Sequence, residues 1–149
     1  MVKYKQTVIP EATSIWHDST QQELRRLVLD YVKKHFKGVV VRNLSLDIPI
    51  IISVTSGRKT ALGGAMYRKK AELVRVLPAI IRVAQYNNFG ARKATDNPSV
   101  IGYLNFKAKC KLDGKVEHVR LAVQFQRGGK YYYNVEVNKK EDTPKKPLR

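Results

Sequence analysis

The stretch Leu104–Val135, LNFKAKCKLDGKVEHVRLAVQFQRGGKYYYNV, decides the fold because it holds three strand patterns and two turn signals. Asp113-Gly114 is typical of a two-residue hairpin turn. A hairpin that turns there pairs Lys109 with His118 and Lys107 with Arg120. In this register the apolar side chains of both strands share one face, which supports the pairing; they are Leu104, Phe106, Ala108, Cys110, Val119, Leu121, Val123 and Phe125.

The second turn contains Gly128-Gly129 and permits two registers. A two-residue loop puts the strands out of phase, whereas a three-residue loop with a glycine bulge keeps the apolar faces aligned. We favour the longer loop, which pairs Gln126 with Lys130 and Arg120 with Glu136. The stretch therefore predicts a three-stranded antiparallel meander.

Two elements are predicted upstream of the meander. Thr20 and Glu23 form a capping-box pattern, and apolar residues then recur every three or four positions as far as Phe36, which predicts a helix that Gly38 ends. From Leu44 to Val54 the apolar spacing switches to two, which predicts a strand. Pro49 cannot donate a ladder hydrogen bond and indicates an edge or a bulge.

A second helix is predicted from about Met66 to Tyr86, with Pro78 kinking or breaking it. The polar segment from Asn87 to Ser99 is interpreted as a loop. The expected fold class is therefore α+β: helix, strand, helix and meander, with both helices on one face of a single antiparallel sheet. We expect an N-terminal arm over residues 1–18, one domain over 19–138, and a basic disordered tail over 139–149.

The charge of the chain is its strongest functional signal. It carries 29 Lys and Arg against 12 Asp and Glu, a formal net charge of +17. Such an excess attracts polyanions, with nucleic acid first and an anionic membrane second. No window offers the roughly 18 apolar residues of a membrane span, and the N-terminus lacks the apolar core of a signal peptide, so we expect no membrane partner.

Cysteine and histidine usage argues against metal chemistry. Cys110 is alone, and the histidines at positions 17, 35 and 118 are scattered, so the sequence predicts neither a metal site nor another cofactor.

The polar face of the meander holds the candidate catalytic residues. A metal-independent ribonuclease needs a base, an acid and cations for the phosphate. His118 and Glu136 are candidates for base and acid, Arg120 with Lys107 or Lys109 for phosphate binding, and Tyr132 for base stacking. An ordinary solvated face, with Arg120 and Glu136 as a cross-strand ion pair, is the alternative interpretation.

Basic residues outside the meander face the same two interpretations. They are Arg58, Lys59 and Thr60 in the predicted loop and Arg68, Lys69 and Lys70 in the second helix. They form either a phosphate track or ordinary solvated charge.

Four stretches together resemble the barnase/EndoU/colicin-D/RelE-like superfamily, in the form found in phage and mobile-element polyvalent proteins. They are the N-terminal helix, the strand ending in ISVTSGRKT (52–60), the helix containing LPAIIRVA (77–84) and the meander end GKYYYNV (129–135). The resemblance covers roughly residues 40–138. It implies a metal-independent RNA-cleaving toxin or effector domain that acts on tRNA or other RNA, with an open sheet face as the active surface.

The leading hypothesis is thus a cytoplasmically acting ribonuclease domain, for which the resemblance also implies a neutralising immunity or antitoxin protein. Two alternatives stay open. The domain binds nucleic acid without cutting it, as part of a phage or mobile element, or it is an assembly protein whose charge meets an acidic partner.

Overall fold

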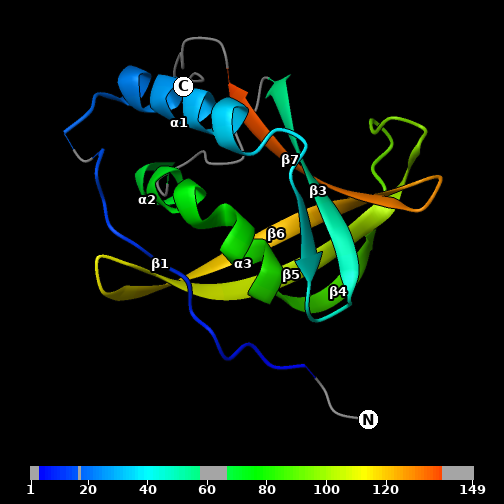
Figure 1. Ribbon diagram of the computed structural model, residues 1–149. Coiled ribbons are helices and arrows are strands. Elements are labelled where there is room, and N and C mark those ends of the chain that lie inside the picture. Colours follow the sequence, from blue (N-terminus) through cyan, green and yellow to red (C-terminus); the bar gives the residue numbers. More distant parts are fainter. Residues whose placement is uncertain (1–3, 17, 58–66, 139–149) are drawn as a thin grey trace, which may run out of the picture.

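The computed structural model describes residues 4–16, 18–57 and 67–138 (Figure 1). In these ranges the chain forms one curled seven-stranded sheet with helices packed against its inner side. The strands follow the order β1-β5-β6-β7-β3-β2, and β4 also pairs with β5. The elements are β1 (Glu11–Ala12), α1 (Gln21–His35), β2 (Val40–Asn43), β3 (Ile48–Gly57), α2 (Tyr67–Leu73), the 3-10 turn η2 (Val74–Val76), α3 (Leu77–Val83), β4 (Gln85–Ala91), β5 (Val100–Leu112), β6 (Lys115–Gln126) and β7 (Lys130–Asn138).

Helix α1 begins at the predicted capping box. The Thr20 hydroxyl accepts from the Glu23 amide, and the Glu23 carboxylate accepts from the Thr20 amide. These two bonds satisfy amides that have no partner inside the helix, and hydrogen bonding from the Thr20 amide and side chain lowers the pKa of the Glu23 carboxyl. The apolar face of α1 lies in the core, with Leu24, Val28 and Val32 fully buried.

The β5–β6 hairpin has the predicted register. Lys107 pairs with Arg120 and Lys109 with His118, while Asp113 and Gly114 both adopt positive φ at the turn. The face predicted to be apolar supplies much of the core, including Phe106, Ala108, Cys110, Leu121 and Val123.

The third strand departs from the predicted meander. Gln126 pairs with Lys130 and Phe125 with Tyr131 as expected, but the register between β6 and β7 ends at Gln124 and Tyr132. From there β7 runs parallel to β3, with Ile51 opposite Tyr132 (Figure 1). The sheet is therefore mixed and not antiparallel, because β7 returns beside a strand that precedes both α2 and α3.

The strand predicted at Leu44–Val54 begins later than expected, because residues 44–47 form a turn and β3 begins at Ile48; β2, which precedes the turn, was not predicted. β2 and β3 form a hairpin in which Asn43 pairs with Ile48, and Asp47 adopts positive φ in the turn between them. Alternate residues of β3 direct their backbone amides and carbonyls across the hairpin. Ile52 is one of them, because its amide donates to the Val39 carbonyl. Pro49 has the opposite parity, and pairing with β7 begins only at Ile51, so the missing amide of Pro49 interrupts neither ladder.

The predicted second helix is shorter than expected and is broken. Turn η2 separates α2 from α3, with Pro78 in the first turn of α3. The helical pattern stops at Val83, and the polar loop predicted from Asn87 to Ser99 is correct for residues 92–99 but wrong before them. Its first residues, together with Gln85 and Tyr86, form β4, which pairs with β5.

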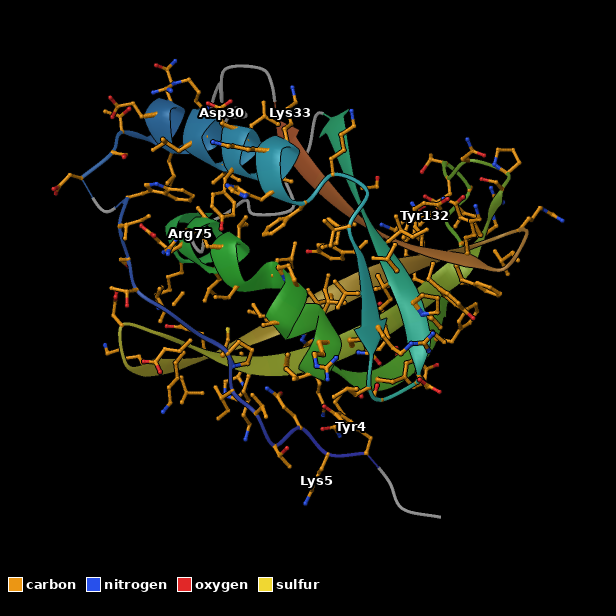
Figure 2. All side chains as sticks on the ribbon, viewed as in Figure 1. Tyr4, Lys5, Asp30, Lys33, Arg75 and Tyr132 are labelled. Carbon is orange, nitrogen blue, oxygen red and sulfur yellow. The ribbon has the colours of Figure 1, made fainter. Side chains whose placement is uncertain are left out.

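The N-terminal segment lies along the edge of β5 beyond the end of β4. β1 pairs in parallel with Lys111 and Leu112. The buried Glu72 carboxylate accepts from the Ile15 and Trp16 amides and from Arg75, whose guanidinium also donates to the Thr13 carbonyl and lies over the Trp16 ring. Glu72 and Arg75 thus hold the segment against α2 and η2 (Figure 2).

Within the described ranges, no helix is long and apolar enough to span a bilayer.

Candidate nucleic-acid interface

The outer face of the β5–β6 hairpin carries a cluster of exposed cationic and titratable side chains. Lys107 stands opposite Arg120, and Lys109 stands opposite His118, in consecutive pairs on the same face. The opposite parity carries the buried core residues of the hairpin, among them Phe106, Ala108 and Leu121. Successive side chains of a strand point to opposite faces of the sheet, so the pattern that buries the apolar residues also places these four side chains together on the outer face.

The N-terminal segment turns this face into a groove. The Gln6 side chain donates to the Lys109 carbonyl and accepts from the Lys109 amide, both at 2.8–2.9 Å, as a neighbouring strand would. The Tyr4 hydroxyl donates to the Val83 carbonyl at 2.9 Å, and partial burial raises the pKa of Tyr4. Figure 2 shows Tyr4 and Lys5 on this segment, far from Asp30 and Lys33 on α1.

The groove between segment and hairpin has a volume of about 680 Å³. Its charged lining is Lys5, Lys107, Lys109, His118 and Arg120, and Gln6 and Gln85 add amides. Two further hollows of about 450 and 460 Å³ adjoin it, because both share Lys107 with the groove and the larger one also shares Arg120. We call the three hollows together the outer groove.

No Asp or Glu is among the described residues that line the outer groove. The nearby carboxylates are engaged elsewhere. Glu117 pairs with Lys69 at 3.3 Å from the opposite face of β6, and Asp113 accepts from Ser14. Glu11 is in register with Lys111, beyond the groove lining. The positive charge of the groove is therefore not neutralised from within.

The structure separates Glu136 from its predicted neighbour. Its backbone pairs with Thr55 of β3, and Arg120 lies outside the β6–β7 register. The predicted Arg120–Glu136 pair is wrong because β7 leaves β6 after Tyr132. Tyr132 itself is half-buried between Gln124 and Ile51, at the far end of the face from the groove (Figure 2).

The second predicted cluster does not join the groove in the described residues. Lys69 lies on the helical side of the sheet, where it pairs with Glu117. Arg58, Lys59 and Thr60 lie outside the described residues, as do the side chains of Arg68 and Lys70.

Two other reactive side chains belong to the core. Cys110 is fully buried, and burial raises its pKa to about 11, so it is not an available nucleophile. Burial likewise raises the pKa of Tyr133 to about 12. No group of three or more metal-ligating side chains occurs among the described residues.

Sequence reasoning missed the residues that complete the groove: Lys5, Gln6, Gln85, Asn87, Asn88 and Asn105. Asn105 could have been predicted from the sequence, because it has the same parity as Lys107 on the same strand. The others come from the N-terminal segment and from β4. No periodic pattern in the sequence indicated that these two segments would pair with β5.

Comparison with known proteins adds a family. No curated protein and no solved structure matches the chain significantly. Residues 19–133, from the N-cap region of α1 to Tyr133 of β7, match the family described as Large polyvalent protein-associated domain 3. This match spans most of the chain, including both strands of the β5–β6 hairpin and β4. The chain therefore belongs to the Large polyvalent protein-associated domain 3 family.

Proposed function

We propose that this domain binds single-stranded RNA in the outer groove, with Lys107, Lys109 and Arg120 contacting phosphates. The carrying observation is the acid-free groove of about 680 Å³, in which three cations and His118 from β5 and β6 meet Lys5 of the N-terminal segment. Cations that no local carboxylate neutralises release counterions when they bind a phosphate backbone.

The amide side chains favour single-stranded RNA over duplex DNA. Gln6, Gln85, Asn87 and Asn105 offer both donors and acceptors beside the cations. Such groups recognise base edges, which only an unpaired strand presents in full. The resemblance to RNA-cleaving domains points in the same direction.

RNA cleavage is a second candidate function, favoured by the position of His118 opposite Lys109 and in the same hollow as Arg120. In this mechanism the 2′-hydroxyl attacks phosphorus and its proton passes to the His118 imidazole. The bond from phosphorus to the 5′-oxygen breaks, that oxygen takes a proton from water, and the imidazolium of His118 returns its proton to the hydroxide that is left. Lys109 and Arg120 stabilise the charge that develops on the phosphoryl oxygens. The products are a 2′,3′-cyclic phosphate and a 5′-hydroxyl.

Binding is tested by fluorescence anisotropy with a labelled single-stranded RNA over a range of salt concentrations. We expect affinity to fall steeply with salt, with a slope of about −0.7 for each phosphate contacted. Absence of binding to RNA even at low salt would overturn the proposal and favour an acidic protein as partner.

Cleavage is tested by incubating RNA with the protein in EDTA and analysing the ends. We expect cyclic phosphate products from the native protein and a loss of about 100-fold or more in the His118→Ala variant, as for removal of a general acid–base group. His35→Ala is the matched control, because His35 is exposed on α1, contacts Tyr31 and is not among the residues that line the groove. Intact RNA with the native protein would leave binding as the function.

A further inference from the structure

The part of the outer groove between β4 and the middle of the hairpin differs from the rest. This hollow of about 460 Å³ is lined by Asn87, Asn88, Asn105 and Ala122 together with Lys107 and Arg120 at its border with the main groove. Its size falls in the range of about 300–1,000 Å³ that is usual for small-molecule sites. We call it the amide hollow.

A bulge in β4 builds one wall of the amide hollow. The register between β4 and β5 shifts between Tyr86 and Asn88, so Asn87 is the extra residue and has no partner in the β4–β5 register. Bulges redirect a side chain without ending the strand. Asn87 is exposed here and joins the lining beside Asn88.

A fixed amide pair forms the polar wall. Asn88 and Asn105 are cross-strand partners, and Asn105 Nδ2 donates to Asn88 Oδ1 at 2.9 Å. This bond orients both amides. Each Asn carries two donors and a carbonyl acceptor, so the pair still presents Asn88 Nδ2 as a donor and Asn105 Oδ1 as an acceptor. A phosphate would be repelled by the carbonyl oxygen, whereas the edge of a nucleobase carries both donors and acceptors.

The floor of the amide hollow is open because a small residue stands in it. Ala122 is the register partner of Asn105 and is exposed, while the next residues on its face of β6 are the larger Arg120 and Gln124. A longer side chain at this position would occupy the space. Lys107 and Arg120, at the border of the amide hollow, are the cations that we propose to bind phosphates. A base in the hollow would therefore belong to an RNA strand whose backbone lies in the adjoining hollow of about 680 Å³.

We propose that the amide hollow receives one unpaired nucleobase of the bound RNA, held by Asn88 and Asn105 above Ala122 while Lys107 and Arg120 hold the adjoining phosphates. This inference rests on the proposed RNA binding and adds a base-contacting subsite to it.

The test compares labelled RNA homopolymers with an abasic oligomer of the same length and charge by anisotropy. For the native protein we expect at least one base-bearing oligomer to bind about ten-fold more tightly than the abasic one, the scale of one base contact. Ala122→Leu should remove this difference and leave abasic binding unchanged. Ala79→Leu is the control, because Ala79 is exposed on α3 outside the groove lining.

A second variant protects the test against a local distortion of β6. Asn105→Ala removes one half of the amide pair without adding bulk, and it should also reduce the difference between base-bearing and abasic oligomers. Circular dichroism checks that both variants are folded.

The outcomes separate the two proposals. Equal binding of abasic and base-bearing oligomers, or a difference that survives Ala122→Leu, would overturn the base subsite and leave the groove. An equal loss of affinity for both kinds of oligomer in Ala122→Leu would mean that the RNA backbone passes through the hollow, and it would overturn the base subsite as well. Failure of every oligomer to bind the native protein would overturn RNA binding itself.

Discussion

Replacing Lys107 and Arg120 together by glutamate is expected to weaken RNA binding by about 100-fold or more at low salt. These residues stand opposite each other at the centre of the outer groove, and Lys107 lines all three of its hollows. Charge reversal replaces two phosphate contacts by two repulsions. The salt dependence should also flatten, its slope falling in magnitude by about 1.4 for two lost contacts to a single strand. Anisotropy at several salt concentrations measures both effects.

The matched control is Lys33→Glu with Lys34→Glu. Both lysines are exposed on α1, and Figure 2 places Lys33 far from Tyr4 and Lys5 beside the groove. The control changes the net charge by the same amount, so it should weaken binding only slightly. Equal losses in the two double variants would mean that overall charge, and not the groove, attracts the RNA.

The second large effect is expected at Asn43, which is fully buried where the β2–β3 turn meets α3. Its Nδ2 donates to the Ile81 and Ala84 carbonyls, and its Oδ1 accepts from the Leu46 amide and the Ser45 hydroxyl. Asn43→Ala leaves several buried polar groups without a partner, at about 1–3 kcal/mol each where water cannot reach them. We expect the free energy of unfolding to fall by about 3–4 kcal/mol, measured as a shift of the urea midpoint at constant slope.

Asn87→Ala is the control for this stability measurement, because Asn87 is exposed and such surface changes usually stay within about 0.5 kcal/mol. A loss below about 1 kcal/mol in Asn43→Ala would show that the hydrogen bonds of the Asn43 side chain are not what joins the turn to α3. The junction matters for the groove, because β4 begins directly after it and carries Gln85 and the amide hollow.

The sequence was sufficient for the parts of the fold that depend on neighbouring residues. The capping box at Thr20 and the turn at Asp113-Gly114 each act over a few residues, and both were predicted correctly. The pairing of Lys107 with Arg120 followed from that turn, because hairpin register is set locally. The opposed positions of Lys107 and Arg120, and of Lys109 and His118, were therefore predicted from the sequence.

The parts that failed depend on contacts between distant residues. β4 contains Gln85, two asparagines and a bulge, and it forms a strand because β5 offers it an edge, not because its own composition favours one. β7 left the predicted meander because β3 competed for it, and nothing near Tyr132 encodes that choice. The docking of Gln6 on Lys109 is equally remote in sequence.

The parallel pairing of β3 with β7 also constrains the order in which the chain can fold. β3 is made early, yet its partner follows α2, α3 and three further strands. During synthesis β3 has only the short β2 beside it and keeps its other edge unpaired until β7 leaves the ribosome. Non-local pairings of this kind slow folding and expose edges to wrong partners. Until β7 is made, the free edge of β3 is consequently the part of the nascent sheet that is most open to wrong pairing.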